Sequence, residues 1–424
     1  MDRMSLRELA VPIIKAIDSF NYLLKSHHRR TAVAAYHIAN KMGLGNEDMF
    51  ELVVAAGIHD IGALSIQERD MLVQVDVANP APHCTMGHRM LASFYPFKNI
   101  AQIIKHHHIS YQDSMHMNAG EVLFQSHIIH LADRVDVLIN PDSFILNQKK
   151  QVVETINAKT GMTFHPKVVE AFNEVSKADI FWIEINNLDI DQLFRRLDVS
   201  VDFELTIDNI IDFALTLSRI IDFRSRFTAS HSYTVAHLSN LFGEYFGFSE
   251  EKCKKLLVSG YLHDIGKIGI DPGLIEKKEP LSNEEYNLIK LHAYYTGQIL
   301  KELSLSPWFG EIVEWAEKHH EKIDGMGYPY ALKELDIDNG SKIIAFSDVI
   351  SALLEERPYR KAMPIDVAFN IIREKIAPSI SCSMFQVIEQ HKKEINNLVK
   401  KCHNHTFEEY RLDNELGTNL WAPS

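Results

Sequence analysis

The side chains most suited to chemistry are histidines and aspartates that occur twice along the chain in the same order. Each copy has a Ser-His pair, a His-Asp pair, a single His, a His-His pair and a later Asp. The first copy consists of Ser26-His27, His59-Asp60, His83, His106-His107 and Asp133; the second consists of Ser230-His231, His263-Asp264, His292, His319-His320 and Asp348. Imidazoles combined with carboxylates are typical ligands of Mn, Fe, Zn and similar divalent ions. The sequence therefore predicts two related metal-binding units.

The spacing between the copies favours a duplication. The separation between equivalent residues is the same for His27 and His59, and it grows only slightly and in one direction toward Asp133. Such a drift is expected when surface loops lengthen after a duplication. A single histidine on a helix is more often structural than a ligand. Adjacent His-Asp and His-His pairs among apolar helical segments, found twice, favour a metal site over core packing.

Composition limits the partners of the protein. Its 424 residues, 46% of them apolar, allow two globular domains with full cores. The net charge of −13 argues against broad binding to DNA, RNA or an anionic membrane. Four cysteines are too few for a disulfide framework, and no segment resembles a secretory signal or a membrane span. We therefore expect a cytoplasmic protein; its composition leaves homo-oligomerisation open.

Apolar residues at helical spacing dominate the chain, and strand-like alternation is scarce. Helices are expected at 6–24, 49–58, 121–139, 206–223, 251–262, 283–300 and 343–354. Asn46 and Ser249, each followed by acidic residues, are expected at helix starts. The charged segment 186–201 is interpreted as a boundary leading into a connecting helix, and the polar tail after about Asn396 shows no recognisable chemistry. We predict an all-α protein with domains at 1–200 and 201–424.

The second copy contains motifs that, in this order, resemble a known family. They are His231, HDIGKIGI at 263–270, His292, HHEKIDGMGYP at 319–329 and FSDVISALLEERPYRKAM at 346–363. This order resembles the HD-GYP phosphodiesterases, the branch of the HD hydrolase superfamily that degrades cyclic dinucleotides. The resemblance covers roughly residues 224 to 375, and a His-Asp pair together with a Gly-Tyr-Pro loop is highly specific. It implies tandem HD-type helical bundles, the first of them divergent.

The resemblance also implies roles for individual residues. One divalent ion would be held by His231, His263, Asp264 and Asp348, and Asp264 would bridge to a second ion held by His292, His319 and His320. Two ions, Fe or Mn before other divalent metals, would activate water and clamp phosphate oxygens. Lys267 would act with Asp264 in catalysis by neutralising charge on the phosphate. Tyr328 in the Gly-Tyr-Pro loop and the pair Arg360-Lys361 would be further substrate contacts.

Three positions depart from the family pattern. Phe227 stands where some members have an acid that binds a third metal, so two metals are favoured. Ser351, three residues after Asp348, replaces a second aspartate of the family and leaves the support of the metal ligands open. Ala293 replaces a common proline, with little expected effect. Within the loop, Asp324 is compatible both with a functional role and with capping the turn.

The first copy keeps the ligand types and lacks the residues beside them. Ala63 stands at the position of Lys267, HHHISYQDSMHM replaces the Gly-Tyr-Pro segment, and NPDSFIL replaces the Arg-Lys segment. His28 and His108 are alternatives to their neighbours as ligands of this second metal site. Three roles stay open for the first domain: a structural partner, a regulatory domain that binds metal or nucleotide, and a second hydrolase of different specificity.

The function that these features favour is metal-dependent hydrolysis of a 3′,5′-linked cyclic dinucleotide in signalling. The substrate would be c-di-GMP or 3′,3′-cGAMP, cut to the linear dinucleotide and then to mononucleotides; no motif distinguishes guanine from adenine. One alternative is another nucleotide phosphohydrolase of the HD superfamily, against which the Gly-Tyr-Pro loop argues. The other is a catalytically silent sensor of cyclic dinucleotides, against which the retained Lys267 and the His-His pair argue.

Overall fold

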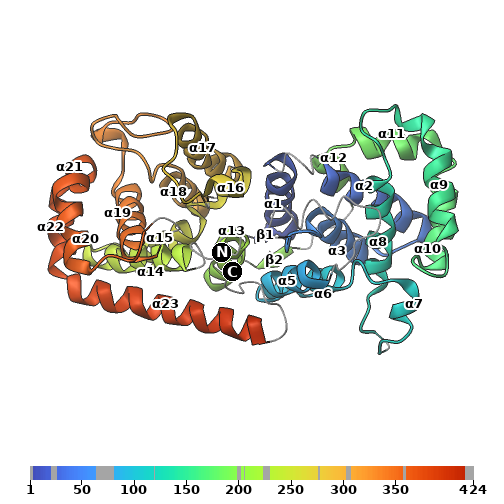
Figure 1. Ribbon diagram of the computed structural model, residues 1–424, viewed down its shortest axis with the longest axis horizontal. Helices are drawn as coiled ribbons and strands as arrows, with labels where there is room; N and C mark the ends of the chain where they lie inside the picture. The colour runs from blue at the N-terminus through green and yellow to red at the C-terminus, as the bar shows by residue number, and fades with distance from the viewer. Residues whose placement is uncertain are drawn as a thin grey trace. The chain divides into compact units, whose positions relative to one another are not determined.

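The computed structural model describes residues 3–20, 26–63, 81–118, 120–197, 202–204, 206–222, 230–275, 277–301, 307–356 and 360–415. The chain divides into two compact units, a first domain from Arg3 to Glu204 and a second domain that begins at Leu205 (Figure 1). Apart from two short strands, the described elements are helices, so the predicted all-α class is confirmed. No described helix is long and apolar enough to cross a bilayer. The four cysteines are free.

The first domain combines one two-stranded ribbon with short helices. Its strands are antiparallel, with Met4 opposite Phe203. The elements are β1 (Arg3–Ser5), α1 (Leu6–Phe20), α2 (His27–Met42), α3 (Asn46–Ile58), α5 (Ala81–Ala92), α6 (Lys98–Lys105), α7 (Tyr111–Ser114), α8 (Phe124–Val137), α9 (Lys149–Ala158), α10 (Pro166–Val175), α11 (Asp179–Asn187), α12 (Ile190–Arg196) and β2 (Asp202–Glu204), with 3-10 turns at Tyr95–Phe97 and Ile145–Asn147.

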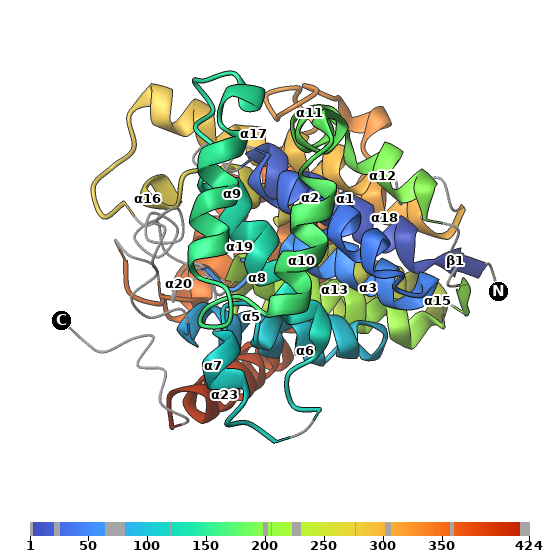
Figure 2. The same cartoon turned by 90° about the vertical axis from the view of Figure 1, so that its right-hand side faces the viewer.

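Helices α2, α3 and α8 form the centre of the first domain. Helix α2 packs against both α3 and α8, and α10 and α11 lie over α2 on the outside (Figure 2). The faces that meet are apolar: Val33, Ile38, Leu52 and Leu131 are completely buried. Burial of such side chains contributes about 1.5–3 kcal/mol each. The polar side chains of the repeat are thus held by a rigid apolar frame.

The second domain has the same order of elements at its start and a long helix at its end. The elements are α13 (Ile207–Asp222), α14 (His231–Tyr245), α15 (Glu250–Leu262), η3 (Ile265–Gly269), α16 (Pro272–Ile275), α17 (Asn283–Leu300), α18 (Pro307–Glu317), η5 (Glu334–Asp336), α19 (Asn339–Leu354), α20 (Ile365–Ile371), η6 (Ile372–Ile376), α21 (Ala377–Ile380), α22 (Cys382–Gln390) and α23 (Lys392–Glu415). Helix α14 contacts α15, α19 and α23, and α23 is the long red helix of Figure 1.

The fold repeats with the sequence. Gly43, which ends α2, and Gly247, which follows α14, stand at equivalent positions of the two copies, and both adopt left-handed backbone, with φ of 76° and 70°. Glycine is favoured there because other residues are strained at positive φ. Helices α2 and α14, α3 and α15, and α8 and α19 therefore occupy corresponding places, and each carries or precedes corresponding members of the two histidine–aspartate sets.

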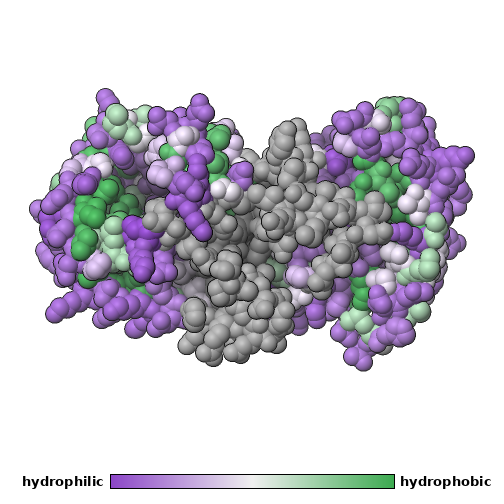
Figure 3. Space-filling view, viewed as in Figure 1, coloured by the Kyte–Doolittle hydropathy of each residue, from purple (hydrophilic) through white to green (hydrophobic). Residues whose placement is uncertain are grey.

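Most predicted helices form with shifted ends. Helix α17 has the predicted bounds, whereas α8 is shorter at both ends, and α1 and α13 are described only to Phe20 and Asp222. Ser249 caps α15 by accepting from the amide of Lys252. In the first domain the cap residue is Gly45, because α3 already begins at Asn46. On the face shown in Figure 3, the coloured surface is mostly hydrophilic, with smaller apolar patches.

Candidate metal centre and active site

The ligand-type residues of the second domain come from five places in the fold and meet in its interior. His231 begins α14, His263 and Asp264 follow α15, His292 lies in α17, His319 and His320 follow α18, and Asp348 lies in α19. Two groups have ligand atoms within 4.8 Å of one another: His231, His263 and Asp264 form one, and His292, His319 and His320 form the other. Asp348 joins the first group, because its Oδ1 lies 3.2 Å from Nε2 of His231.

Asp264 lies between the two groups with one carboxylate oxygen toward each. Its Oδ2 is 3.2 Å from Nε2 of His263 and 3.7 Å from Nε2 of His231. Its Oδ1 is 3.4 Å from Nε2 of His292. A carboxylate with this orientation can be shared by two cations, one held by each group.

The backbone sets the tautomers of the imidazoles. Nδ1 of His263, His292 and His319 lies 2.7, 2.6 and 2.6 Å from the carbonyl oxygen three residues earlier. A carbonyl only accepts, so Nδ1 carries the proton and Nε2 offers its lone pair. The three Nε2 atoms are buried and have no hydrogen-bond partner. Buried lone pairs that converge in this way fit divalent metal ions.

Protonation also suits metal binding. Burial lowers the pKa of His292 to about 4 and that of His320 to about 3, so both are neutral at neutral pH. Burial favours the neutral acid at Asp264, but His263 and Lys267 outweigh it and hold the pKa of this carboxyl well below its ordinary value. His292 and His320 are thus neutral imidazoles and Asp264 is an anionic carboxylate, which are the forms that bind cations.

Lys267 is held beside the shared carboxylate. It lies in the 3-10 turn η3, and its ammonium is paired with Oδ2 of Asp264. Gly266 permits this turn, because a Cβ there would lie 2.0 Å from the carbonyl oxygen of His292. The amide of Gly266 donates to the hydroxyl of Thr296, which donates to the carbonyl oxygen of His263. The structure thus brings the predicted Lys267 to the cluster.

The Gly-Tyr-Pro loop covers the His-His side of the cluster. The ring of Tyr328 lies 4.7 Å from that of His320, with 32° between the planes. The buried carboxylate of Glu321 accepts from the amides of Tyr330 and Leu332 and fixes the loop, a role that the sequence interpretation missed although Glu321 directly follows the pair. Asp324 accepts from the amide of Met326, which assigns it to the turn.

Arg360 and Lys361, the predicted phosphate contacts after α19, have no contact with the cluster comparable to those of Lys267 and Tyr328 among the described residues. The guanidinium of Arg360 donates to the carbonyl oxygens of Ala352, Leu353 and Lys361, so it caps the end of α19. Lys361 is exposed. Phe227, the position linked to a third metal, lies outside the described residues.

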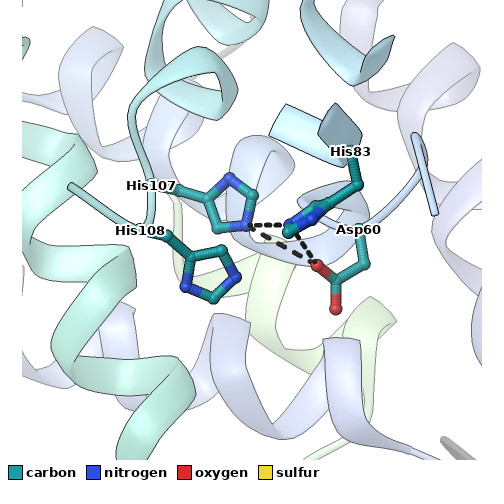
Figure 4. Close-up of side chains that lie close together, drawn as sticks. All are labelled: Asp60, His83, His107 and His108. Atoms are coloured by element: carbon teal, nitrogen blue, oxygen red, sulfur yellow. Dashed lines mark hydrogen bonds and ion pairs between the residues drawn. The ribbon is translucent and has the colours of Figure 1, made fainter. Parts of the chain in front are cut away.

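In the first domain the structure brings together a similar cluster with one change of residue. His83, His107, His108 and Asp60 form one group (Figure 4), and His27, His59 and Asp133 form another. The expected pair was His106-His107, but His106 lies outside both groups. The pair in the structure is His107-His108. His107 is the second residue after the end of α6, as His319 is after α18, and three consecutive histidines made this position ambiguous in the sequence.

The two clusters agree closely in geometry. Oδ2 of Asp60 lies 3.3 Å from Nε2 of His59, and its Oδ1 lies 3.4 Å from Nε2 of His83. Nδ1 of His59 and His107 again faces the carbonyl oxygen three residues earlier, at 2.8 and 2.7 Å. His28 belongs to a further group with His59 and Asp60. The ligand geometry is therefore shared by the two domains.

The surroundings of the two clusters differ. The ligand side chains of the first domain are at most 5% exposed, whereas Asp348 and Lys267 in the second are each 17% exposed. Ala63 stands where the second domain has Lys267, and the buried Arg134 pairs with Asp133 at 2.6 Å. The first cluster is closed, and the second is open beside its lysine.

Comparison with known proteins agrees with the doubled site. An HD domain profile matches residues 24–138 and, in a second form, residues 216–378. The 3′3′-cGAMP-specific phosphodiesterase 1 of Vibrio cholerae is 30% identical over 414 residues, which cover 93% of this chain and 94% of that protein. A cyclic di-GMP phosphodiesterase of Thermotoga maritima is 33% identical over 178 residues, 42% of this chain and 48% of that protein.

A solved structure shares the fold. The crystal structure of a cyclic GMP-AMP specific phosphodiesterase of V. cholerae matches with a TM-score of 0.61 at 22% identity, covering 94% of this chain and 99% of that chain. HD-domain phosphodiesterases are metal-dependent, and both clusters have residues that could bind metal. Near full-length similarity, the paired HD domains and the His-Asp and Gly-Tyr-Pro motifs together show that the chain belongs to the HD-GYP family of phosphodiesterases.

Proposed function

We propose that the second domain hydrolyses a phosphodiester bond of a 3′,5′-linked cyclic dinucleotide and releases the linear dinucleotide. The observation that carries this proposal is the meeting of the histidine–aspartate cluster with Lys267 and Tyr328 at one partly open site. Among substrates, 3′,3′-cGAMP comes first and c-di-GMP second. The relative that matches through both domains is named as specific for 3′3′-cGAMP, whereas the T. maritima relative named for cyclic di-GMP matches 42% of this chain.

The proposed cofactors are two divalent ions, Mn or Fe before others. His231, His263 and Asp348 would hold one, the three other histidines would hold the second, and Asp264 would be shared. When bound, the ions supply an activated water and neutralise phosphate charge. Lys267 would hold a phosphate oxygen beside them, and the Tyr328 ring, fixed against His320, would offer a face to a base or ribose.

The test is purification without oxygen, metal analysis and a parallel assay of 3′,3′-cGAMP, c-di-GMP and c-di-AMP. We expect turnover of the first two, and none in Asp264→Ala, which removes the shared ligand. Full activity in Asp264→Ala would exclude the mechanism. Faster turnover of linear nucleotides would instead favour another phosphohydrolase, and tight binding without turnover in Mn²⁺ or Fe²⁺ would favour a sensor.

For the first domain we propose a metal-holding role without hydrolysis. Its cluster matches the other in ligand types and distances, which supports metal binding. Its ligands are closed off from solvent, and Ala63 offers no cation to a phosphate, which argues against turnover. A metal held there would link α2, α3 and α8 and stabilise their packing. This would suit a structural or regulatory role for the first domain.

Metal counting in two matched variants tests this role. His59→Ala and His263→Ala remove equivalent ligands of the two copies. We expect each variant to lose part of the metal bound per chain, and only His263→Ala to lose phosphodiesterase activity. If His263→Ala removes all metal from the chain, the first domain is not a metal site.

A further inference from the structure

The support behind the first histidine ligand differs between the two domains. In the first domain, Nδ1 of His27 lies 2.6 Å from Oδ2 of Asp136, which is three residues after Asp133 in α8. In the second domain the residue three after Asp348 is Ser351, whose hydroxyl oxygen lies 3.0 Å from Nδ1 of His231. The second domain therefore has a neutral group at this position in place of a carboxylate.

The second domain has a carboxylate, that of Glu355, one helical turn after Ser351. Glu355 follows Ser351 by four residues, so it lies on the same face at the end of α19. It is 2% exposed; its Oε1 accepts from the Ser351 hydroxyl at 3.0 Å, and its Oε2 lies 3.3 Å from Nδ1 of His231. The imidazole N–H thus donates to the serine hydroxyl, and the hydroxyl donates to the glutamate.

The same carboxylate reaches two other elements. The hydroxyl of Ser230, directly before α14, lies 3.4 Å from Oε1 of Glu355, and Nε2 of His403 in α23 lies 3.3 Å from it. Helix α23 also packs along α14, the helix that begins with His231. The C-terminal helix, whose sequence showed no chemistry, therefore contributes a side chain to the support of a metal-ligand candidate.

We propose that Glu355 is the positioning residue of His231, acting through Ser351 and fixed from behind by His403. It takes the place that Asp136 has in the first domain, with the carboxylate moved by one helical turn. A ligand imidazole hydrogen-bonded to a carboxylate is oriented and made more basic, so Glu355 would strengthen metal binding at His231. The proposal deepens the proposed function, because His231 is one of its metal ligands.

The test exchanges the two carboxylate positions. Glu355→Gln keeps the size of the side chain and removes its charge, and Ser351→Asp/Glu355→Ser restores the arrangement of the first domain. Glu356→Gln, at an exposed neighbour, is the matched control. Metal content after gel filtration, the Mn²⁺ concentration for half-maximal activation, kcat and KM are measured for each, with circular dichroism as the check on folding.

We expect Glu355→Gln to weaken Mn²⁺ activation by roughly 10- to 100-fold and to lower kcat while KM stays unchanged. The double variant is expected to recover most of both losses, His403→Gln to show a smaller loss, and Glu356→Gln to behave as wild type. Wild-type metal content and kcat in Glu355→Gln would overturn the proposal. So would a folded double variant as impaired as Glu355→Gln.

The metal measurement separates this proposal from the proposed function. If the wild type binds metal but turns over no cyclic dinucleotide, the proposed function fails. Loss of metal in Glu355→Gln and its return in the double variant would then still support the positioning role. Unchanged metal content in both variants would reject that role whatever the substrate.

Discussion

Gly266→Ala is expected to damage the active site without unfolding the domain. The added Cβ would lie 2.0 Å from the carbonyl oxygen of His292 and 2.5 Å from the amide nitrogen of Thr296. Both are backbone atoms, so no side-chain rotation relieves the overlap. The distance from the Cβ to the carbonyl oxygen must open from 2.0 Å to the 3.4 Å at which ordinary contact begins. The turn that carries Lys267 must therefore move away from helix α17.

This displacement acts on both halves of the cluster at once, because Asp264 lies on one side of the contact and His292 on the other. A misplacement of about 1 Å can lower a rate by roughly 100-fold, so we expect kcat to fall at least about 100-fold, or about 3 kcal/mol in activation free energy. The assays are steady-state kinetics on 3′,3′-cGAMP, metal content and circular dichroism. Helical content is expected to stay near that of wild type.

Two glycines provide controls. Gly310 in α18 has no atom within 4 Å of the position of its Cβ, so Gly310→Ala should leave kcat unchanged and stabilise the helix by about 0.5–1 kcal/mol. A Cβ at Gly62 would lie 2.1 Å from the carbonyl oxygen of His83, so Gly62→Ala should disturb only the first cluster. Wild-type kcat and metal content in Gly266→Ala would refute the reasoning.

Three further predictions concern single residues of the second site. Lys267→Met, which keeps the stem and removes the charge, should lower kcat by roughly 100- to 1,000-fold with metal content unchanged; loss of metal would show a structural role instead. Tyr328→Ala should raise KM while Tyr328→Phe keeps it near wild type, and equal defects would show that the hydroxyl matters more than the ring. The pKa of His292 is about 4 when folded against roughly 6.5 when unfolded. Between these values the unfolded chain binds more protons, so in the metal-free protein His292 alone should contribute a loss of about 1.5 kcal/mol of unfolding free energy between about pH 6.5 and pH 5. Urea unfolding in chelator measures this loss, and a slope as steep in His292→Asn would contradict the assignment.

The sequence was sufficient to predict the helical class and the gathering of most ligand-type residues, because helix periodicity and the doubled spacing are local signals. It could not choose between His106 and His108, because three consecutive histidines offer two equal pairs and only the end of α6 selects one. The positions of the side chains then decide the choice: His107 and His108, and not His106, have ligand atoms close to those of Asp60 and His83.

Residues that act through tertiary contacts were harder to predict. Glu355 supports His231 from a helix that is distant in sequence, and His403 reaches it from a tail that showed no motif. Arg360 is a different case: its guanidinium donates to carbonyl groups at the end of α19, which the motif did not indicate, and its contact with phosphate stays a prediction. Spacing along a chain reports which side chains share a helix face, but not which free backbone groups lie near a charged side chain.

The bonds from imidazole Nδ1 to backbone carbonyls have a consequence for metal binding. Among the described histidines, His59, His107, His263, His292 and His319 are oriented by their own helical turns before any ion arrives. Imidazoles that are already oriented lose little conformational freedom when an ion binds, so a larger share of the interaction energy appears as affinity. The metal-free protein is therefore expected to have its ligands in place and to take up a divalent ion without refolding.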